Sequence, residues 1–82
     1  MKALVKTHES LLNTPNIKFK SDGYWTEYQD INFGGCMTCG MLDDLGKEIN
    51  VESMDGLSYG YSYIGPSGFK YANWMLEEIK ED

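Results

Sequence analysis

Glycine-containing turn sequences interrupt this chain at short, even intervals, and they restrict its fold more than any other feature. Ser-Asp-Gly occupies residues 21–23, Asp-Gly residues 55–56 and Pro-Ser-Gly residues 66–68. Glycine tolerates the positive φ angles that tight hairpin turns require. Turn sequences spaced by roughly ten residues are typical of short strands joined by tight connections. We therefore predict a small domain built mainly from β-strands.

Alternating polar and apolar residues between these turns indicate where the strands lie. The predicted strands are residues 2–6, 17–20, 24–28, 47–53, 57–64 and 69–72. The last three are consecutive and are predicted to pair as an antiparallel meander. Short helical turns are predicted at 8–12, within 36–45 and at 73–79, with Thr7 and Asn73 as N-caps of the first and last.

So small a sheet protects its edges best by curling on itself. We therefore predict a mainly β (α+β) fold, a small antiparallel, barrel-like sheet of about five strands with short helical insertions. With 82 residues the chain forms a single small domain over 1–82, with a thin core.

The charge balance narrows the range of partners. The formal net charge is −6, and every basic residue is a lysine. Sequence-specific duplex DNA binding favours a basic surface and bidentate arginine contacts, so we expect no binding to duplex DNA. The simplest interpretation is that the charge keeps the protein soluble. An acidic decoy for a basic partner is the alternative.

No apolar run reaches the roughly 18–20 residues of a membrane span, and residues 1–8 lack the apolar stretch of a signal peptide. We therefore expect no membrane association and a cytoplasmic location.

The segment 57–64 reads Leu-Ser-Tyr-Gly-Tyr-Ser-Tyr-Ile. Strand alternation predicts Tyr59, Tyr61 and Tyr63 on one face, opposite a nearly bare face of serine and glycine. Three phenols on one face form either a recognition surface or an unusual core. They also offer a surface for self-association, so we expect a homo-oligomer.

Aromatic side chains concentrate in the predicted hairpins and the closing segment. Nucleotide bases stack on such rings, and a neighbouring lysine can neutralise a phosphate. The candidate ligand-binding residues are Tyr59, Tyr61, Tyr63, Lys70, Tyr71 and Trp25. Core or interface packing is the competing explanation for these rings. The expected partner is therefore a small nucleotide-like ligand or another protein.

Cys36 and Cys39 have the spacing of half a zinc knuckle. A structural zinc needs four ligands, and the single histidine, His8, is far away in the sequence. A redox role needs a cation or helix start that lowers a thiol pKa, and no basic residue flanks the pair. Free thiols are the favoured interpretation, with the two cysteines as weak metal-site candidates and no cofactor expected.

We expect no catalysis and name no catalytic residue. The chain has no nucleophile elbow, phosphate loop or dinucleotide fingerprint. A single histidine, two cysteines and scattered carboxylates make a sparse set from which to assemble a nucleophile, a base and an orienting group.

Three short pieces carry a resemblance to a known group of proteins. They are residues 10–15 (Ser-Leu-Leu-Asn-Thr-Pro), Met41-Leu42 leading to 45–51 (Leu-Gly-Lys-Glu-Ile-Asn-Val), and 74–77 (Trp-Met-Leu-Glu). Their order and spacing, after an opening strand, resemble small phage-encoded accessory proteins with an SH3-like or similar β-barrel look. None of the pieces is catalytic.

The resemblance implies an infected bacterial cytoplasm and a counter-defence or host-takeover role performed by binding. Sequestration of a nucleotide-derived signalling molecule is the favoured form of that role. The alternative is an acidic inhibitor of a host enzyme or nucleic-acid-binding protein, with Asp43, Asp44, Glu77 and Glu78 on the contact surface.

Overall fold

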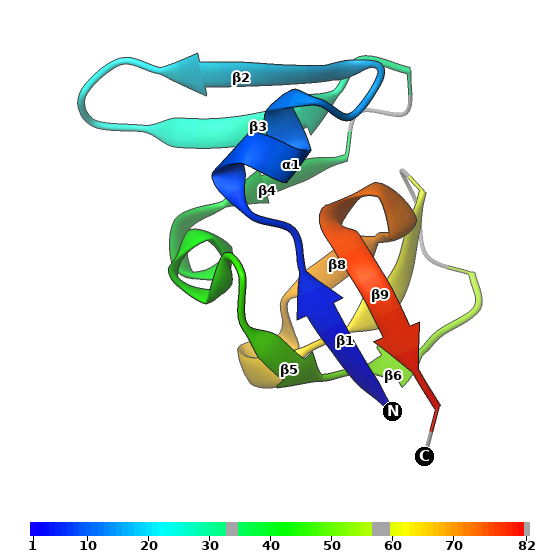
Figure 1. Ribbon diagram of the computed structural model, residues 1–82. Coiled ribbons are helices and arrows are strands. Elements are labelled where there is room, and N and C mark those ends of the chain that lie inside the picture. Colours follow the sequence, from blue (N-terminus) through cyan, green and yellow to red (C-terminus); the bar gives the residue numbers. More distant parts are fainter. Residues whose placement is uncertain (33–34, 57–59, 82) are drawn as a thin grey trace.

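The computed structural model describes residues 1–32, 35–56 and 60–81. Within these ranges nine short strands form three antiparallel sheets of three strands each (Figure 1). The mainly β, antiparallel character predicted from the turn spacing is confirmed. The strands are more numerous and shorter than predicted, and the three sheets found here are separate rather than one closed sheet.

The described elements follow one another in the order β1 (Lys2–Val5), α1 (His8–Leu12), β2 (Ile17–Ser21), β3 (Thr26–Asp30), β4 (Cys36–Thr38), the 3₁₀ helix η1 (Cys39–Asp44), β5 (Glu48–Asn50), β6 (Glu52–Ser53), β7 (Tyr61–Ile64), η2 (Pro66–Gly68), β8 (Lys70–Ala72), η3 (Asn73–Met75) and β9 (Leu76–Lys80). The sheet orders are β5-β1-β9, β2-β3-β4 and β6-β7-β8. The last of these corresponds to the predicted meander in part: of the predicted strand 47–53 only its end, β6, belongs to this sheet, whereas β5 pairs with β1.

One bent stretch of chain joins two of the sheets. β5 belongs to the first sheet and β6 to the third, and Val51 alone separates them. Val51 is buried, and its N–H donates to the carbonyl of Met1 at 2.9 Å. The chain therefore changes sheet at a buried, hydrogen-bonded residue rather than at a loop.

The hairpin β2–β3 forms where the sequence predicts it. Gly23 has a φ of 92° in the turn, and the carboxylate of Asp22 accepts hydrogen bonds from the N–H groups of Tyr24 and Trp25. Those bonds from Trp25 and Tyr24 lower the pKa of the Asp22 carboxyl group. The Asp-Gly pair thus supplies both the backbone freedom and the side-chain acceptor that close the turn.

The short helix α1 begins at the predicted cap and packs on this hairpin. The side chain of Thr7 accepts a hydrogen bond from the N–H of Ser10 at 3.1 Å. Nδ1 of His8 is hydrogen-bonded to the hydroxyl of Tyr28, and the rings of His8 and Phe19 meet edge to face at 5.1 Å. Burial raises the pKa of Tyr28. An aromatic contact therefore fixes α1 against β2 and β3.

The helical prediction for 73–79 is wrong in most of its length. Only Asn73–Met75 form a helical turn, and Leu76–Lys80 form strand β9. β9 pairs with β1 in antiparallel register, with Ala3 opposite Ile79. Pairing with a central strand satisfies more backbone groups than an isolated short helix could, so tertiary pairing overrides the local pattern.

The helical prediction within 36–45 is correct for its later part only. Residues Cys36–Thr38 form β4, which pairs with β3 and places Met37 opposite Tyr28. Both of these side chains are buried. The helical turns begin at Cys39 and end at Asp44.

The buried core draws on every sheet, and its fully buried members of largest volume are Tyr28, Tyr71, Leu11, Met37, Met75 and Val5. Tyr71 has an exposed fraction of 0%, and its hydroxyl has no hydrogen-bond partner among the described residues. Burial, reinforced by the negative charge of Asp44, raises the pKa of Tyr71 to about 12.

Replacing Tyr71 with phenylalanine is therefore expected to leave the free energy of unfolding at neutral pH within about 1 kcal/mol of wild type, or to raise it, because no hydrogen bond is lost. The variant should also lose less stability in alkali. Above the unfolded pKa of about 10 the unfolded tyrosine releases a proton that the native one keeps, so wild-type stability falls as pH rises towards 12. Urea denaturation at pH 7 and pH 11 measures both effects; an equal loss in the two proteins at pH 11 would contradict the second.

Candidate functional site

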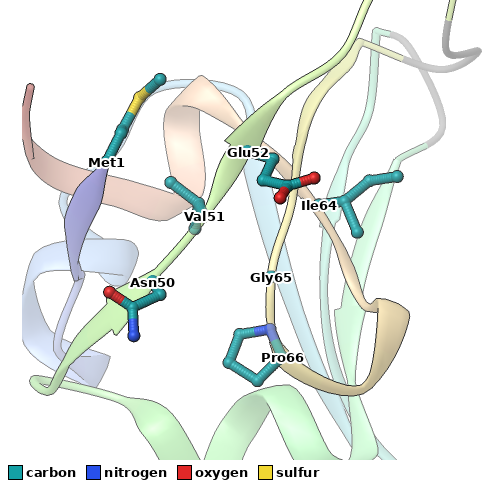
Figure 2. A pocket seen from close by; sticks show the side chains of 7 residues that line it. All are labelled: Met1, Asn50, Val51, Glu52, Ile64, Gly65 and Pro66. Carbon is teal, nitrogen blue, oxygen red and sulfur yellow. The ribbon is translucent and has the colours of Figure 1, made fainter.

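Among the hollows on the surface of the described chain are two of small-molecule size. The larger has a volume of about 550 Å³ and lies where β5 passes into β6, beside the end of β7 (Figure 2). The smaller, of about 440 Å³, lies between β4, η1, β7 and the turn before β8. Both volumes fall within the usual range of small-molecule sites.

The larger hollow lacks the chemistry expected for a nucleotide. Its lining is Met1, Asn50, Val51, Glu52, Ile64, Gly65 and Pro66 (Figure 2). This lining contains no aromatic ring and no lysine, and its one charged side chain is the carboxylate of Glu52. No ring is present there to stack on a nucleobase, and no lysine side chain to neutralise a phosphate, so this hollow is the weaker candidate for a nucleotide site.

The smaller hollow combines aromatic, apolar and cationic side chains, and its lining is Cys36, Thr38, Met41, Tyr61, Gly68, Phe69 and Lys70. Tyr61 and Phe69 are half-buried, and Lys70 is exposed. Two of the predicted ligand-binding residues, Tyr61 and Lys70, are therefore neighbours around one opening. Cys36, considered above as a thiol or metal ligand, lies in the same wall.

Tyr61 fixes the wall of this hollow through its hydroxyl group. The hydroxyl accepts a hydrogen bond from the N–H of Cys36 at 2.9 Å and lies 3.2 Å from the Cys36 carbonyl, to which it donates. Burial is the main reason that the pKa of Tyr61 is raised, and the neighbouring Cys36 thiol adds to it. The phenol therefore ties β7 to the backbone of β4, leaving its ring to line the hollow.

The ring of Phe69 packs directly against Gly40, which has no side chain. A Cβ atom built on Gly40 would lie 2.9 Å from Cε2 and Cζ of the Phe69 ring. Such a distance is shorter than carbon atoms tolerate, so the ring occupies the space that a larger residue at position 40 would need. Gly40 in η1 thus allows the close approach of Phe69 from the turn before β8.

An irregularity in β7 separates the tyrosines that alternation predicts to share a face. Tyr61 pairs with Ala72 and Tyr63 pairs with Tyr71, so the register shifts between Tyr61 and Tyr63. Ala72 and Tyr71 are adjacent in β8 and point to opposite faces, and paired residues share a face. The prediction of one phenolic face is therefore wrong for Tyr61 and Tyr63.

The remaining predicted ligand residues lie elsewhere. Tyr71 is in the core with no exposed surface, which removes it from any surface site in this structure. Tyr63 is half-buried on the other face of β7, and Trp25, with an exposed fraction of 46%, lies beside the β2–β3 turn. Tyr59 falls outside the described residues.

The cysteines form no described metal cluster. Cys36 is a half-buried free thiol, and Cys39 begins η1 with a side chain that lies outside the described set. Within the part of the chain that the structure describes, no three His, Cys, Asp or Glu side chains come together closely enough to hold a metal ion.

The four acids named for a contact surface occupy two different elements. Asp43 and Asp44 are in η1, whereas Glu77 and Glu78 are in β9. Asp44 is half-buried, and its negative charge helps to raise the pKa of the buried Tyr71. The Glu77 carboxylate accepts a hydrogen bond from the hydroxyl of Ser10 at 3.1 Å. Among the described residues no interaction links Asp43 and Asp44 to Glu77 and Glu78, so nothing there favours the acidic-inhibitor alternative.

Thr38, Met41 and Gly68 are lining residues that the sequence does not indicate. Helical turns were predicted within 36–45, and that prediction did not include strand β4. It therefore gave no reason to place Thr38 near Phe69. The Pro-Ser-Gly turn at 66–68 is recognisable in the sequence, but only the packing of that turn against β4 brings Gly68 to the hollow.

Comparison of the chain with protein-family models, with curated proteins and with solved structures finds no match. Among the described helices, none has both the length and the apolar character needed to cross a membrane.

Proposed function

We propose that this protein acts by binding a small nucleotide-like ligand in the hollow between β4, η1, β7 and β8. The observation that carries the proposal is the meeting of two aromatic rings, Tyr61 and Phe69, with the ammonium group of Lys70 around one opening. Aromatic rings stack on nucleobases for about 1–3 kcal/mol per base, and an ammonium group attracts phosphate.

Lys70 is available for such a role. Its side chain is exposed, and within the described ranges no carboxylate lies within ion-pair distance of it. Lys2 and Lys80, by contrast, both lie beside the carboxylate of Glu48, at 3.7 and 3.5 Å. The local charge at the hollow is therefore positive although the net charge of the chain is −6.

The proposal is for binding without chemical change. The lining of the hollow includes the thiol of Cys36, the hydroxyl of Thr38 and the amine of Lys70, but neither a histidine nor a carboxylate to activate one of them as a general base. A ligand held there would be sequestered and released intact.

The resemblance to phage accessory proteins supplies the proposed setting, an infected bacterial cytoplasm in which the protein sequesters a nucleotide-derived signal. A homo-oligomer belongs to the same proposal. The bent stretch β5–Val51–β6, shared by two sheets, supports the further idea that these sheets form the partly closed, SH3-like barrel that the resemblance implies.

A thermal-shift and calorimetry series tests the binding proposal. Adenine and guanine mono- and cyclic dinucleotides are the probes, and at least one should raise the melting temperature of the wild-type protein. Lys70→Ala should weaken binding about tenfold or more, and Phe69→Leu should do the same by removing the stacking face. Lys47→Ala is the matched control, because Lys47 is an exposed lysine outside the hollow.

Mass spectrometry of the recovered ligand completes the test. An unchanged mass after incubation supports sequestration, whereas a changed mass contradicts it. If no probe binds, or if Lys47→Ala reduces binding as much as Lys70→Ala does, the hollow is not a nucleotide site. Native mass spectrometry of the protein purified from cells measures the number of subunits directly.

A further inference from the structure

The free edge of β2 is a second surface with defined recognition chemistry, separate from the hollow. β2 lies at the edge of its sheet and pairs only with β3. Figure 1 shows β2 at the outer margin of the molecule, with no further strand beside it. We propose that this edge binds an extended acidic segment of a partner protein by addition of a β-strand.

The alternation of hydrogen bonds between β2 and β3 identifies the backbone groups of β2 that face outward. The N–H of Asp22 donates to the carbonyl of Trp25 at 3.2 Å, so residues spaced by two from Asp22 along β2 direct their backbone groups towards β3. Ile17, Phe19 and Ser21 then direct theirs away from the sheet. Among the described residues, no hydrogen bond is made to these three outward-facing backbone positions.

The side chains leave this edge accessible. Residues 18–21 are exposed, and only Ile17 is half-buried. The other edge of the same sheet differs, because the Tyr61 hydroxyl occupies both the N–H and the carbonyl of Cys36 in β4. The β4 edge is therefore occupied at Cys36 by a side chain of the same protein, whereas β2 presents unpaired groups to solvent.

Charge decides what can occupy the edge. Lys18 and Lys20 share one face of β2, and no carboxylate of the described residues lies within ion-pair distance of either. Lys20 lies opposite Glu27 in β3. Its charge also adds to the backbone hydrogen bonds in lowering the pKa of Asp22, so Lys18 is the less compensated of the two. A second copy paired antiparallel about Phe19 would set Lys18 opposite Lys20 of the other copy, which is a repulsive arrangement. A strand with acidic residues at alternate positions would instead place opposite charges beside both lysines.

The other face of β2 adds an apolar contact. Phe19 has an exposed fraction of 40%, and its ring meets that of His8 at 5.1 Å. An added strand with acidic residues on one face and apolar residues on the other would therefore match both faces of β2. Because Phe19 and the two lysines alternate, a partner with the same alternation satisfies them together.

Titration of the full-length protein with a synthetic peptide tests this proposal. The probe is an acetylated and amidated peptide of alternating glutamate and valine, and the readout is the shift of backbone amide signals by NMR. The largest shifts are expected at Ile17, Phe19 and Ser21. A peptide of alternating lysine and valine should bind at least about tenfold more weakly, and N-methylation of the residues facing β2 should abolish binding.

Two pairs of variants separate strand addition from non-specific charge attraction. Ser21→Pro removes an outward N–H and should weaken peptide binding, whereas Ser21→Ala, which loses the same hydroxyl group, should not. The double variant Lys18→Glu and Lys20→Glu should reverse the preference between the two peptides. Lys47→Glu, a single charge reversal away from β2, should leave the preference unchanged.

The proposal is overturned if millimolar glutamate–valine peptide shifts no β2 amide, if the N-methylated peptide binds equally well, or if Ser21→Pro and Ser21→Ala behave alike. Circular dichroism and the melting temperature of each variant show that it is folded. Nucleotide binding at the hollow is measured in the same samples, so the strand-addition proposal and the nucleotide-binding proposal are tested independently of each other.

Discussion

Replacing Gly65 with alanine is expected to lower the free energy of unfolding by about 1–3 kcal/mol, the usual cost of overpacking a filled core. The new Cβ atom would lie 2.7 Å from Cε2 of Tyr71 and 3.5 Å from Cδ1 of Ile49. Tyr71 is fully buried and cannot swing into solvent, so the backbone or the ring must shift. For a domain of this size each 1 kcal/mol corresponds to roughly 4–8 °C in melting temperature.

The backbone angle makes this substitution a clean test of packing. Gly65 has a φ of −102°, which alanine adopts without strain, so the expected loss comes from the contact with Tyr71 rather than from the turn. Alanine should cost much less in a Tyr71→Leu background, where the ring is absent. Equal costs in the two backgrounds, measured by urea denaturation, would show that the ring contact is not the cause.

Replacing Tyr61 with phenylalanine is expected to cost about 1–3 kcal/mol, because it leaves the N–H and the carbonyl of Cys36 without the partner they have in the wild type. The change should also loosen the wall of the hollow, since the hydroxyl ties β4 to β7. Hydrogen exchange of the Cys36 amide should accelerate more than that of the other β4 amides.

Tyr24→Phe is the matched control for this prediction. Tyr24 has an exposed fraction of 100%, and no hydrogen bond of its hydroxyl is found in the described structure, so its loss should change stability by less than about 0.5 kcal/mol. Tyr71→Phe provides a second comparison, since its buried hydroxyl is unpaired. If all three substitutions cost the same, the Tyr61 bridge does not stabilise the protein.

Local sequence chemistry predicted those elements whose formation depends on neighbouring residues. Thr7 caps α1, Asp22 and Gly23 close the first hairpin, and the first strand forms at Lys2–Val5, as expected from the pattern. The predictions failed where a helical pattern competed with pairing to another strand. At Leu76–Lys80 the partner strand β1 lies near the other end of the sequence, so no local signal identifies it. At Cys36–Thr38 the partner is the preceding strand β3, and the apolar spacing within 36–45 pointed to helical turns where strand pairing prevails.

The candidate site likewise combines residues that the sequence indicated with residues that only the folded structure brings together. The sequence predicted a site of aromatic and lysine side chains, and two of the residues it named, Tyr61 and Lys70, line one hollow in the structure. Their neighbours Thr38 and Met41 were not predictable, because the contact between β4, η1 and the turn at 66–68 joins segments that are remote in the chain. The burial of Tyr71 likewise depends on the space left above its ring by Gly65.

The β-rich class, the turn positions and the supply of aromatic and lysine side chains all follow from the order of residues, because these depend on φ preferences and residue chemistry alone. The face that each tyrosine occupies depends instead on how the strands pair in the folded protein. A single register shift between Tyr61 and Tyr63 sends one ring to the hollow and the other to the opposite face. Strand alternation has a period of two, so one extra residue reverses every assignment beyond it, and that residue is fixed by pairing with β8.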